Sequence, residues 1–546
     1  MTATATAQAA AEPGVRVQPA PLAAFWRQLR FIARRDRIRA PVWFAAVVGL
    51  VGASAVSVVA LYTTDEDLQS YATLAQANVA FKAVTGPGYG LDDVTLGAVV
   101  MNEVALYTYV AVALMAVFMV VRHTRAEEET ERAELVRAAP VGRYASLAAT
   151  LVWVSGLVIV TAVGLTGTML AVGLNAAGSI AFGAASAAVG LVFVGVAAIA
   201  AQVAVTARAA KSLGGAVLGA SFVIRGVADI GNGWMTWLSP LGITQAIRPF
   251  ADERWWVLVP LAALAFVTTA AAAVLLGRRD LGAGILRQQP GPSTGSPRLG
   301  TPFALAVRLQ RGSLIGWMVG LALTGFFIGL IADEAEALAD NEAVAEMLAR
   351  AGQGSITESL LATMTLMVAL IGSGFTVSSV LRLRTEENAL RADPILATPV
   401  DRRRWFASHY SVAIGGSLLL MLASGVMIGL GYLSATGRTD EFLPVLAAAA
   451  AQWVAMVVLG AFTLALTGFG TRWALFGWVG VIVGFVVGFL GNTLDLPQWA
   501  RNVSPFEHVP AMPAAPFEAT PLLILVAVAV AFTAVAMLAI RRRDLG

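Results

Sequence analysis

The chain has 546 residues, of which 58% are hydrophobic and 13% are charged, and its formal net charge is +3. Soluble globular domains carry about 25% charged residues, so this composition excludes an ordinary soluble domain and indicates a membrane protein. The sequence contains no cysteine, which excludes disulfides and thiol chemistry. The basic residues lie mainly in loops between apolar segments, so we expect no nucleic-acid partner.

The amino-terminal stretch is rich in Ala and Pro and lacks the apolar core of a signal peptide, so we expect a disordered lead over residues 1–21. Apolar residues then recur at helical spacing at Leu22, Phe25, Trp26, Leu29 and Ile32, with arginines between them. This pattern predicts an amphipathic helix at the inner membrane boundary. A simple basic flank of the first membrane span is the alternative.

Twelve apolar segments follow, each of about 20 residues and long enough to cross a hydrocarbon core of roughly 30 Å. They lie near residues 41–62, 97–121, 146–171, 179–206, 212–230, 255–276, 314–332, 359–381, 406–434, 443–468, 472–491 and 520–540. Lys and Arg gather in alternate loops, and short basic loops remain cytoplasmic. The predicted fold is therefore an all-α polytopic membrane protein with 12 transmembrane helices and both termini inside the cell.

A charged stretch between the second and third segments, residues 125–143, returns 259 positions later as residues 384–402. The matching positions are Arg125, Glu127, Glu128, Arg132, Glu134, Pro140 and Arg143 in the first copy, and Arg384, Glu386, Glu387, Arg391, Asp393, Pro399 and Arg402 in the second. Each copy is predicted to form a short helix supported by an i,i+4 pair, Glu128 with Arg132 or Glu387 with Arg391, and ended by a proline. Such self-similarity indicates a duplicated architecture. Two solvated charged loops without a function are the alternative.

An acidic pair, an arginine, another acid and then Ala-x-Pro-Val-x-Arg resemble the first cytoplasmic loop of ABC exporter permeases built from six-helix units. The chain as a whole is similar to the actinobacterial permeases for polyketide antibiotics and other drugs, in which two six-helix units are fused. In that family the loop is a coupling helix that docks on the ATPase subunit. The resemblance therefore implies a bacterial cell-membrane protein that binds two copies of a cytoplasmic ABC ATPase. It assigns ATPase coupling to Glu127, Glu128, Glu131, Arg132, Glu134, Pro140 and Arg143, and to Glu386, Glu387, Arg391, Asp393, Pro399 and Arg402.

Both halves of the chain end on Arg-Arg-Asp-Leu-Gly, at residues 278–282 and 542–546, and a Pro-, Gly- and Ser-rich stretch separates them. We therefore expect a first six-helix unit over residues 22–282, a flexible cytoplasmic linker over 283–301 and a second unit over 302–546. Parallel repeats imply a pseudo-twofold axis along the membrane normal, with the transport pathway where the repeats meet.

Tryptophans mark the outer segment that follows the fifth helix of each unit. Trp234 and Trp237 precede Ser239-Pro240, and Trp499 precedes Ser504-Pro505 at an offset of 265. Tryptophan favours the membrane interface, so an interfacial or re-entrant segment is predicted, and in the resembling family the outer gate lies here. Arg225 and Asp229 stand four residues apart in the fifth segment and are predicted to pair, as a structural contact or as part of the gate.

Glu103 lies near the outer end of the second segment, with Tyr107 one turn later. By the resemblance, the second, fifth, eighth and eleventh helices line the pathway, and Met364 and Met367 of the eighth add soft apolar surface. We therefore predict a pathway for hydrophobic or amphiphilic cargo in contact with membrane lipid, with Glu103 and Tyr107 favouring cations. The alternative is that Glu103 reaches outer water at the interface. In the eleventh segment, Gly480, Gly484 and Gly488 predict a close-packing seam.

The sequence lacks a phosphate-binding GxxxxGK[ST] loop, and His123, His409 and His508 have no metal-binding or catalytic spacing. We therefore predict a permease subunit that is not an enzyme and binds no cofactor or metal, with ATP and Mg held by the partner. Its function would be ATP-driven export of drugs or antibiotics. An ion-gradient-driven transporter is one alternative, but it would need intramembrane acids, for which Glu103 and Asp229 are the main candidates. A lipid translocase of the same architecture is another.

Overall fold

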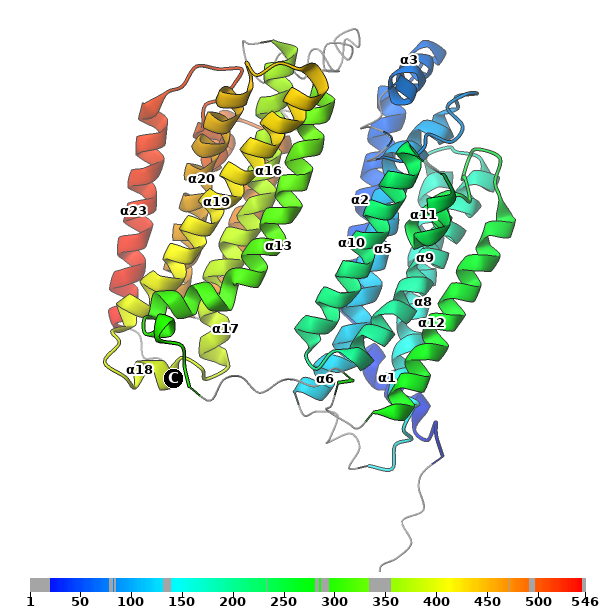
Figure 1. Ribbon diagram of the computed structural model, residues 1–546, viewed down its shortest axis with the longest axis horizontal. Helices are drawn as coiled ribbons and strands as arrows, with labels where there is room; N and C mark the ends of the chain where they lie inside the picture. The colour runs from blue at the N-terminus through cyan, green and yellow to red at the C-terminus, as the bar shows by residue number, and fades with distance from the viewer. Residues whose placement is uncertain are drawn as a thin grey trace, which may run out of the picture. The chain divides into compact units, whose positions relative to one another are not determined.

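The computed structural model describes residues 20–77, 82, 85–130, 139–231, 233–279, 284–285, 294–332, 355–470, 472–490 and 496–542. Within these ranges all regular secondary structure is helical. Contacts divide the chain into two compact units, residues 1–290 and 291–546, which are drawn in Figure 1. Each unit has a hydrophobic core of its own.

Unit 1 is a bundle of long helices around α5 and α9. Its helices are α1 (Phe25–Arg35), α2 (Arg39–Leu61), α3 (Asp65–Ala77), α5 (Leu96–His123), α6 (Arg125–Glu129), α8 (Ala145–Ala171), α9 (Ala176–Val203), α10 (Ala207–Ile230), α11 (Pro240–Gln245) and α12 (Leu258–Arg278), with 3-10 turns η1 (Gly233–Leu238) and η2 (Trp255–Val257). The central α5 and α9 are the most buried of its long helices. The helices α3 and α6 lie at opposite ends of the bundle, here named the α3 end and the α6 end (Figure 1).

Unit 2 is organised around α16, α19 and α20. It contains η3 (Pro297–Leu299), α13 (Pro302–Ile331), α16 (Ile356–Val380), α17 (Arg382–Asn388), α18 (Asp393–Leu396), α19 (Arg402–Thr436), α20 (Phe442–Phe469), η5 (Ala474–Phe476), α21 (Gly477–Leu490), α22 (Gln498–Arg501), η6 (Pro505–His508) and α23 (Ala519–Arg542). Helix α19 packs along α13 and α20, and α23 packs against α20.

Eleven of the described helices are long and apolar enough to cross a membrane, and each corresponds to one of the predicted segments. The exception is the predicted span at 472–491. There the described residues form the short turn η5 and the 14-residue helix α21, which at 1.5 Å per residue is about 21 Å long. The prediction of a full-length span is therefore not met by the described part of this segment, where Ala474 begins a 3-10 turn that precedes the α-helix.

Polar caps explain where several long helices begin. The side chains of Thr95, Asn175, Thr206, Thr301 and Ser355 each accept a hydrogen bond from the backbone amide three residues later. These bonds satisfy amides that have no partner within the first turn of a helix. At Ser355 the bond is reciprocated by Glu358, which accepts from the Ser355 amide and completes a capping box.

Two amino-terminal elements refine the sequence predictions. The predicted amphipathic helix is α1, which begins at Phe25, while Leu22 lies before it. It buries Ile32 and leaves Trp26 and Phe31 exposed. The acidic stretch after the first predicted span forms α3, whose first turn carries three acids (residues 65–67) that favour the positive end of the helix dipole. Most of the acidic stretch between the seventh and eighth predicted spans, residues 333–354, lies outside the described residues.

The glycine face of α21 is occupied within unit 2. A Cβ atom on Gly484 would lie 3.2 Å from the Phe506 ring, and one on Gly480 would lie 3.1 Å from Leu459. The predicted close packing is therefore present. Its partners are Leu459 of α20 and Phe506 of η6, so the seam joins elements of one unit.

Candidate functional site

Three consecutive glutamates of α6 connect the first charged loop to three other elements at the α6 end. Glu127 Oε1 lies 2.6 Å from Arg35 Nη1 of α1. Glu128 contacts Arg279, just after α12, at 2.5 Å, while Glu129 accepts a 2.8 Å bond from the backbone amide of Ala207 at the start of α10. The short helix α6 is therefore anchored to α1, α10 and the end of α12.

Two arginines extend this network. Arg279 Nε donates to Gln202 of α9 at 2.7 Å, and Glu128 also accepts from Arg125 at 2.5 Å. Arg143 donates to the carbonyl oxygens of Leu276 and Arg279, both at 3.0 Å, which satisfies carbonyl groups at the end of α12. The side chains of Glu127 and Glu128 are only 20% and 12% exposed. Their observed contacts are thus internal to unit 1.

The structure describes only some of the other predicted coupling residues of this loop. Pro140 is exposed, as a docking surface would require. Glu131, Arg132 and Glu134, and with them the predicted Glu128–Arg132 pair, lie outside the described residues.

The second charged loop is split into two short helices. Glu386 is buried and lies 2.6 Å from Arg382 and 3.9 Å from Arg391. The prediction of one short helix is wrong, because α17 ends at Asn388 and Leu390 has a left-handed φ of 54°, so Glu387 and Arg391 do not share a helix. The turn directs Arg391 back toward Glu386. Among the remaining predicted coupling residues, Arg391, Asp393, Pro399 and Arg402 are exposed.

A buried carboxylate that the sequence analysis missed holds the end of α5, from which the first charged loop follows. Asp36, between α1 and α2, is fully buried and lies 2.5 Å from His123 Nε2 and 3.3 Å from Arg122 Nε. It also accepts a 3.2 Å bond from Trp153 of α8. Asp36 is the only acid in residues 21–61, which is the one sequence signal that could have identified it.

Unit 2 has an uncharged counterpart of this cluster. The offset of 274 that relates Trp43 to Trp317 also relates Asp36 to Gln310. Gln310 is buried, contacts His409 Nδ1 at 3.2 Å and accepts a hydrogen bond from Ser379. An amide in unit 2 therefore occupies the position of the carboxylate in unit 1.

At the α3 end, Glu103 belongs to a hydrogen-bonded chain that reaches α3. Tyr71 of α3 donates to Glu103 Oε1 at 2.7 Å and accepts from Asn102 Nδ2 at 2.8 Å. The predicted neighbour Tyr107, one turn further along α5, is 54% exposed. The structure thus adds Tyr71 of α3 as the direct partner of Glu103.

The predicted pairing of Arg225 with Asp229 is confirmed. Arg225 Nη1 lies 2.9 Å from Asp229 Oδ2, and both side chains are buried. The guanidinium group also lies over the Phe222 ring at 4.7 Å. The pair belongs to one helix, α10, as its spacing requires.

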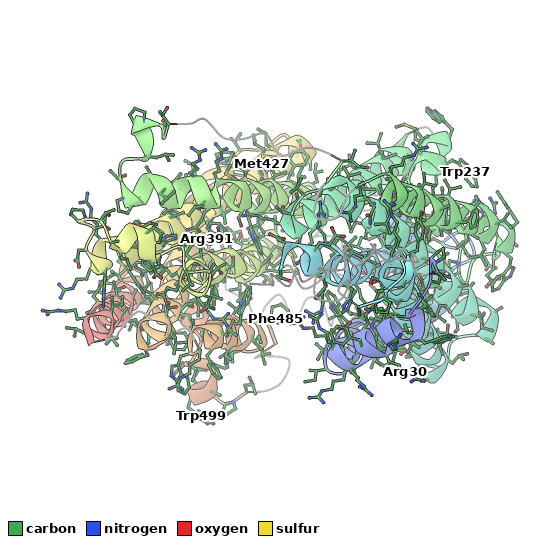
Figure 2. All side chains as sticks on the ribbon, turned by 90° about the horizontal axis from the view of Figure 1, so that it is seen from below. Arg30, Trp237, Arg391, Met427, Phe485 and Trp499 are labelled. Atoms are coloured by element: carbon green, nitrogen blue, oxygen red, sulfur yellow. The ribbon has the colours of Figure 1, made fainter. Side chains whose placement is uncertain are left out.

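The tryptophan segments fold back onto their own units. Trp234 and Trp237 are exposed on η1, and Trp237 stacks on Trp256 at 5.5 Å. The next helix, α11, is held by Ser239, whose hydroxyl donates to the Ser221 carbonyl oxygen at 2.6 Å. In unit 2, Trp499 is 75% exposed and points away from the helices (Figure 2). Exposed tryptophans at the ends of a bundle are typical of a membrane interface.

A search against known proteins places the chain in a family. The family model described as "Multidrug efflux system permease Rv1217c, C-terminal domain" matches residues 29–276 and 299–541. The chain belongs to this permease family. The "Multidrug efflux system permease protein Rv1217c" of Mycobacterium tuberculosis (strain ATCC 25618 / H37Rv) is 40% identical to the chain over 522 residues, which are 94% of each protein. The permease is thus a multi-pass integral membrane protein of the bacterial cell membrane.

Unit 2 of the permease contains an apolar groove that the sequence analysis did not predict. It has a volume of about 500 Å³ and lies between α19, α20 and α23. Its lining is aliphatic and aromatic, and includes Trp453; the Tyr410 and Thr533 hydroxyls in the wall lie 3.3 Å apart. Met364 and Met367 of α16, predicted to line the pathway, are half-buried, and Met364 packs against the core of unit 2.

In the part of the permease that the structure describes, no group of three or more His, Asp or Glu side chains is arranged to hold a metal ion. The close groups of charged residues are ion pairs and hydrogen-bonded clusters within and between helices. The arrangement at the α6 end can therefore transmit movement between helices.

Proposed function

We propose that the chain is the permease subunit of an ATP-driven ABC exporter that moves hydrophobic or amphiphilic drugs or antibiotics out of the cell. The observation that carries this proposal is the anchoring of α6 by residues 127–129. A cytoplasmic partner that displaces α6 would pull directly on Arg35, Ala207 and Arg279. A loop with these contacts can transmit a displacement from a bound partner to the membrane helices.

The partner we propose is a cytoplasmic ABC ATPase, in two copies, each holding ATP and Mg. One copy would contact the first charged loop through its exposed part, which includes Pro140. The other would contact the exposed Arg391, Asp393, Pro399 and Arg402 of the second loop. Association of the two ATPases on ATP binding would then favour one of two arrangements of the permease.

Two observations support an apolar cargo. The relative from M. tuberculosis is named a multidrug efflux permease. The groove beside α23, at about 500 Å³, falls within the range of roughly 300–1,000 Å³ typical of small-molecule sites. Its single pair of neighbouring hydroxyls, from Tyr410 and Thr533, would orient a cargo without restricting it to one shape.

The decisive experiment is reconstitution of the permease in liposomes with a cytoplasmic ABC ATPase of the same organism. We expect a complex with two ATPase copies and ATP-dependent movement of a fluorescent amphiphilic dye. A one-to-one complex would contradict the two-loop assignment. Dye movement driven by an imposed proton gradient without ATP would indicate a secondary transporter, and ATP-dependent movement of labelled phospholipid but not of dye would indicate a lipid translocase.

Exchange of residues 125–143 with 384–402 tests the role of the loops within the same assay. The exchange keeps a glutamate at position 127 but puts Asn388 in place of Glu129, which accepts from the Ala207 amide, so the first loop loses one anchor of α6. We therefore expect the exchanged protein to remain in the membrane but to lose dye-stimulated ATP hydrolysis. Full coupling after the exchange would show that the loop contacts do not carry the coupling.

A further inference from the structure

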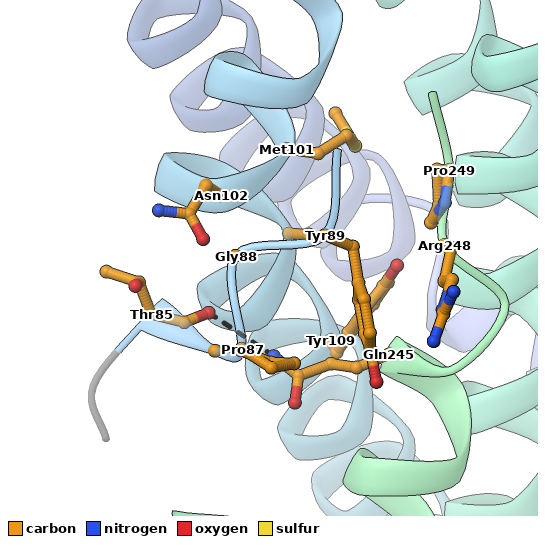
Figure 3. Close-up of a pocket in the computed structure, with 12 residues that line it drawn as sticks. Thr85, Pro87, Gly88, Tyr89, Met101, Asn102, Tyr109, Gln245, Arg248 and Pro249 are labelled. Carbon is orange, nitrogen blue, oxygen red and sulfur yellow. Dashed lines mark hydrogen bonds between the residues drawn. The ribbon is translucent and has the colours of Figure 1, made fainter. Parts of the chain in front are cut away.

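A small cavity at the α3 end of unit 1 lies between α5 and two loops (Figure 3). Its volume is about 40 Å³, and it is lined by Thr85, Gly86, Pro87, Gly88, Tyr89, Met101, Asn102, Ala105, Tyr109, Gln245, Arg248 and Pro249. At roughly 10–15 Å³ for each water molecule, this volume suits a head group of a few atoms. It is too small for a whole drug molecule.

Three polar atoms of the cavity wall are buried and have no hydrogen-bond partner in the part of the chain that the structure describes. They are the Tyr109 hydroxyl, Gln245 Oε1 and Arg248 Nε. Tyr109 is fully buried, and Gln245 is 8% exposed. Buried polar groups in folded proteins are nearly always paired, so three such atoms around one cavity indicate a ligand.

The orientation of the Gln245 amide is fixed by its other contact. Gln245 Nε2 donates to the Thr85 carbonyl oxygen at 3.2 Å, which is the dashed line in Figure 3. A carbonyl oxygen can only accept, so the nitrogen must face Thr85. Gln245 Oε1 therefore remains as an acceptor.

The backbone around the cavity is held in costly conformations. Gly86 and Gly88 have φ values of 127° and 67°, and Arg248, which is not a glycine, has a φ of 56°. A Cβ atom on Gly86 would lie only 2.4 Å from Gln245 Nε2, so glycine permits this close approach. The Arg248 guanidinium group lies over the Tyr89 ring at 4.2 Å. Strained positions that are held by their surroundings concentrate at binding sites.

The three atoms define the chemistry of the ligand. Arg248 Nε can only donate, Gln245 Oε1 can only accept, and the Tyr109 hydroxyl can do either. A carboxylate would suit Arg248 but would place its charge against the Gln245 oxygen. An ammonium group would suit Gln245 but would be repelled by Arg248. A carboxamide offers an acceptor oxygen beside an N–H donor and pairs with all three atoms.

We propose that this cavity binds the carboxamide head group of an amphiphilic molecule. The assignment of that molecule as cargo rests on the proposed export function, whereas binding itself does not. In this role, Tyr109 and Arg248 donate to the amide oxygen, and Gln245 accepts from the amide nitrogen. The apolar remainder of the molecule extends out of the cavity.

The test is ligand-observed saturation-transfer NMR on the full chain in lipid nanodiscs, without ATPase or transport. The probes are butanamide, butanoate and butylamine, which share one alkyl chain. We expect butanamide to bind most tightly and Tyr109→Phe to weaken it about five- to tenfold, as the loss of one buried hydrogen bond predicts. The matched control Tyr144→Phe, at the α6 end, should bind as the wild type does.

The outcomes separate the possibilities. Equal binding of the three probes, or equal affinity in Tyr109→Phe and Tyr144→Phe, would overturn the proposal. Absence of binding by any probe would show that the cavity holds water only. Arg248→Lys provides a second variant, because lysine cannot place a donor at the Nε position, and it should also weaken butanamide. Export assays do not enter the test, so failure of the proposed function would leave the result interpretable.

Discussion

Removal of the Glu128 carboxylate should loosen α6 more than any other single change among the described residues of the first charged loop. In the Glu128→Ala variant, Arg125 and Arg279 lose contacts of 2.5 Å to a carboxylate that is only 12% exposed. Removing one partner of a buried ion pair costs about 3–5 kcal/mol. Arg279 keeps its bond to Gln202, so we expect the lower end of this range. The cost falls on the docking of α6, because Arg125 is the first residue of α6 and Arg279 holds it to the end of α12.

The assay is amide hydrogen exchange of residues 125–130 in the permease. A cost of about 3 kcal/mol corresponds to an increase of roughly a hundredfold in the population of the opened segment. The control is Glu129→Ala, an exposed neighbour that loses one bond to the Ala207 amide and should increase exchange about fivefold, as loss of a cap of about 1 kcal/mol predicts. Equal exchange in the two variants would refute the view that Glu128 is the main anchor of α6.

Three further predictions concern the α3 end. Arg225→Ala should lower the thermal stability of unit 1, because it leaves the Asp229 carboxylate buried without its partner at a cost of about 3–5 kcal/mol. The reversed pair, Arg225→Asp with Asp229→Arg, should restore expression. A reversed pair as unstable as the single variant would show that these residues are not there to pair with each other. Hydrogen bonds from the Thr64 and Thr63 amides hold the pKa of Asp67 below its ordinary value. The start of α3 should therefore lose protection from hydrogen exchange as the pH falls through that lowered pKa, and Asp67→Asn should remove this pH dependence. An unchanged acid profile would contradict this prediction. Glu103→Gln keeps the hydrogen bond from Tyr71 but removes the negative charge. Export of cationic dyes should therefore fall about tenfold, which corresponds to about 1.4 kcal/mol of lost binding free energy. An equal fall for neutral dyes would show that Glu103 has a structural role.

Local patterns in the sequence predicted most of the fold. Eleven membrane-spanning helices follow from runs of apolar residues, because length and hydropathy alone decide whether a helix can span. The Arg225–Asp229 pair follows from i,i+4 spacing within one helix. By contrast, α3 is polar and lacks a clear apolar period, so the sequence analysis did not predict it. This helix depends on a tertiary contact, because Tyr71 packs into an apolar cluster at the end of the bundle.

Contacts between distant residues could not be predicted. Glu128 and Arg279 are separated by 151 residues, and Asp36 and His123 by 87. Their meeting depends on how the helices pack, which one sequence without packing geometry does not determine. The same limit explains why Glu127 and Glu128 were expected on a docking surface. Repetition identifies a loop as important, but it does not show which way each side chain points.

The replacement of Asp36 by Gln310 has a consequence for how the two halves can diverge. In unit 1, any substitution that removes the partners of Asp36 strands a full negative charge in a dry interior, which is among the most costly changes a protein can suffer. In unit 2, the same kind of substitution strands only the dipole of an amide, at a fraction of that cost. Sequence drift at this joint is therefore tightly restricted in the first half and more tolerant in the second.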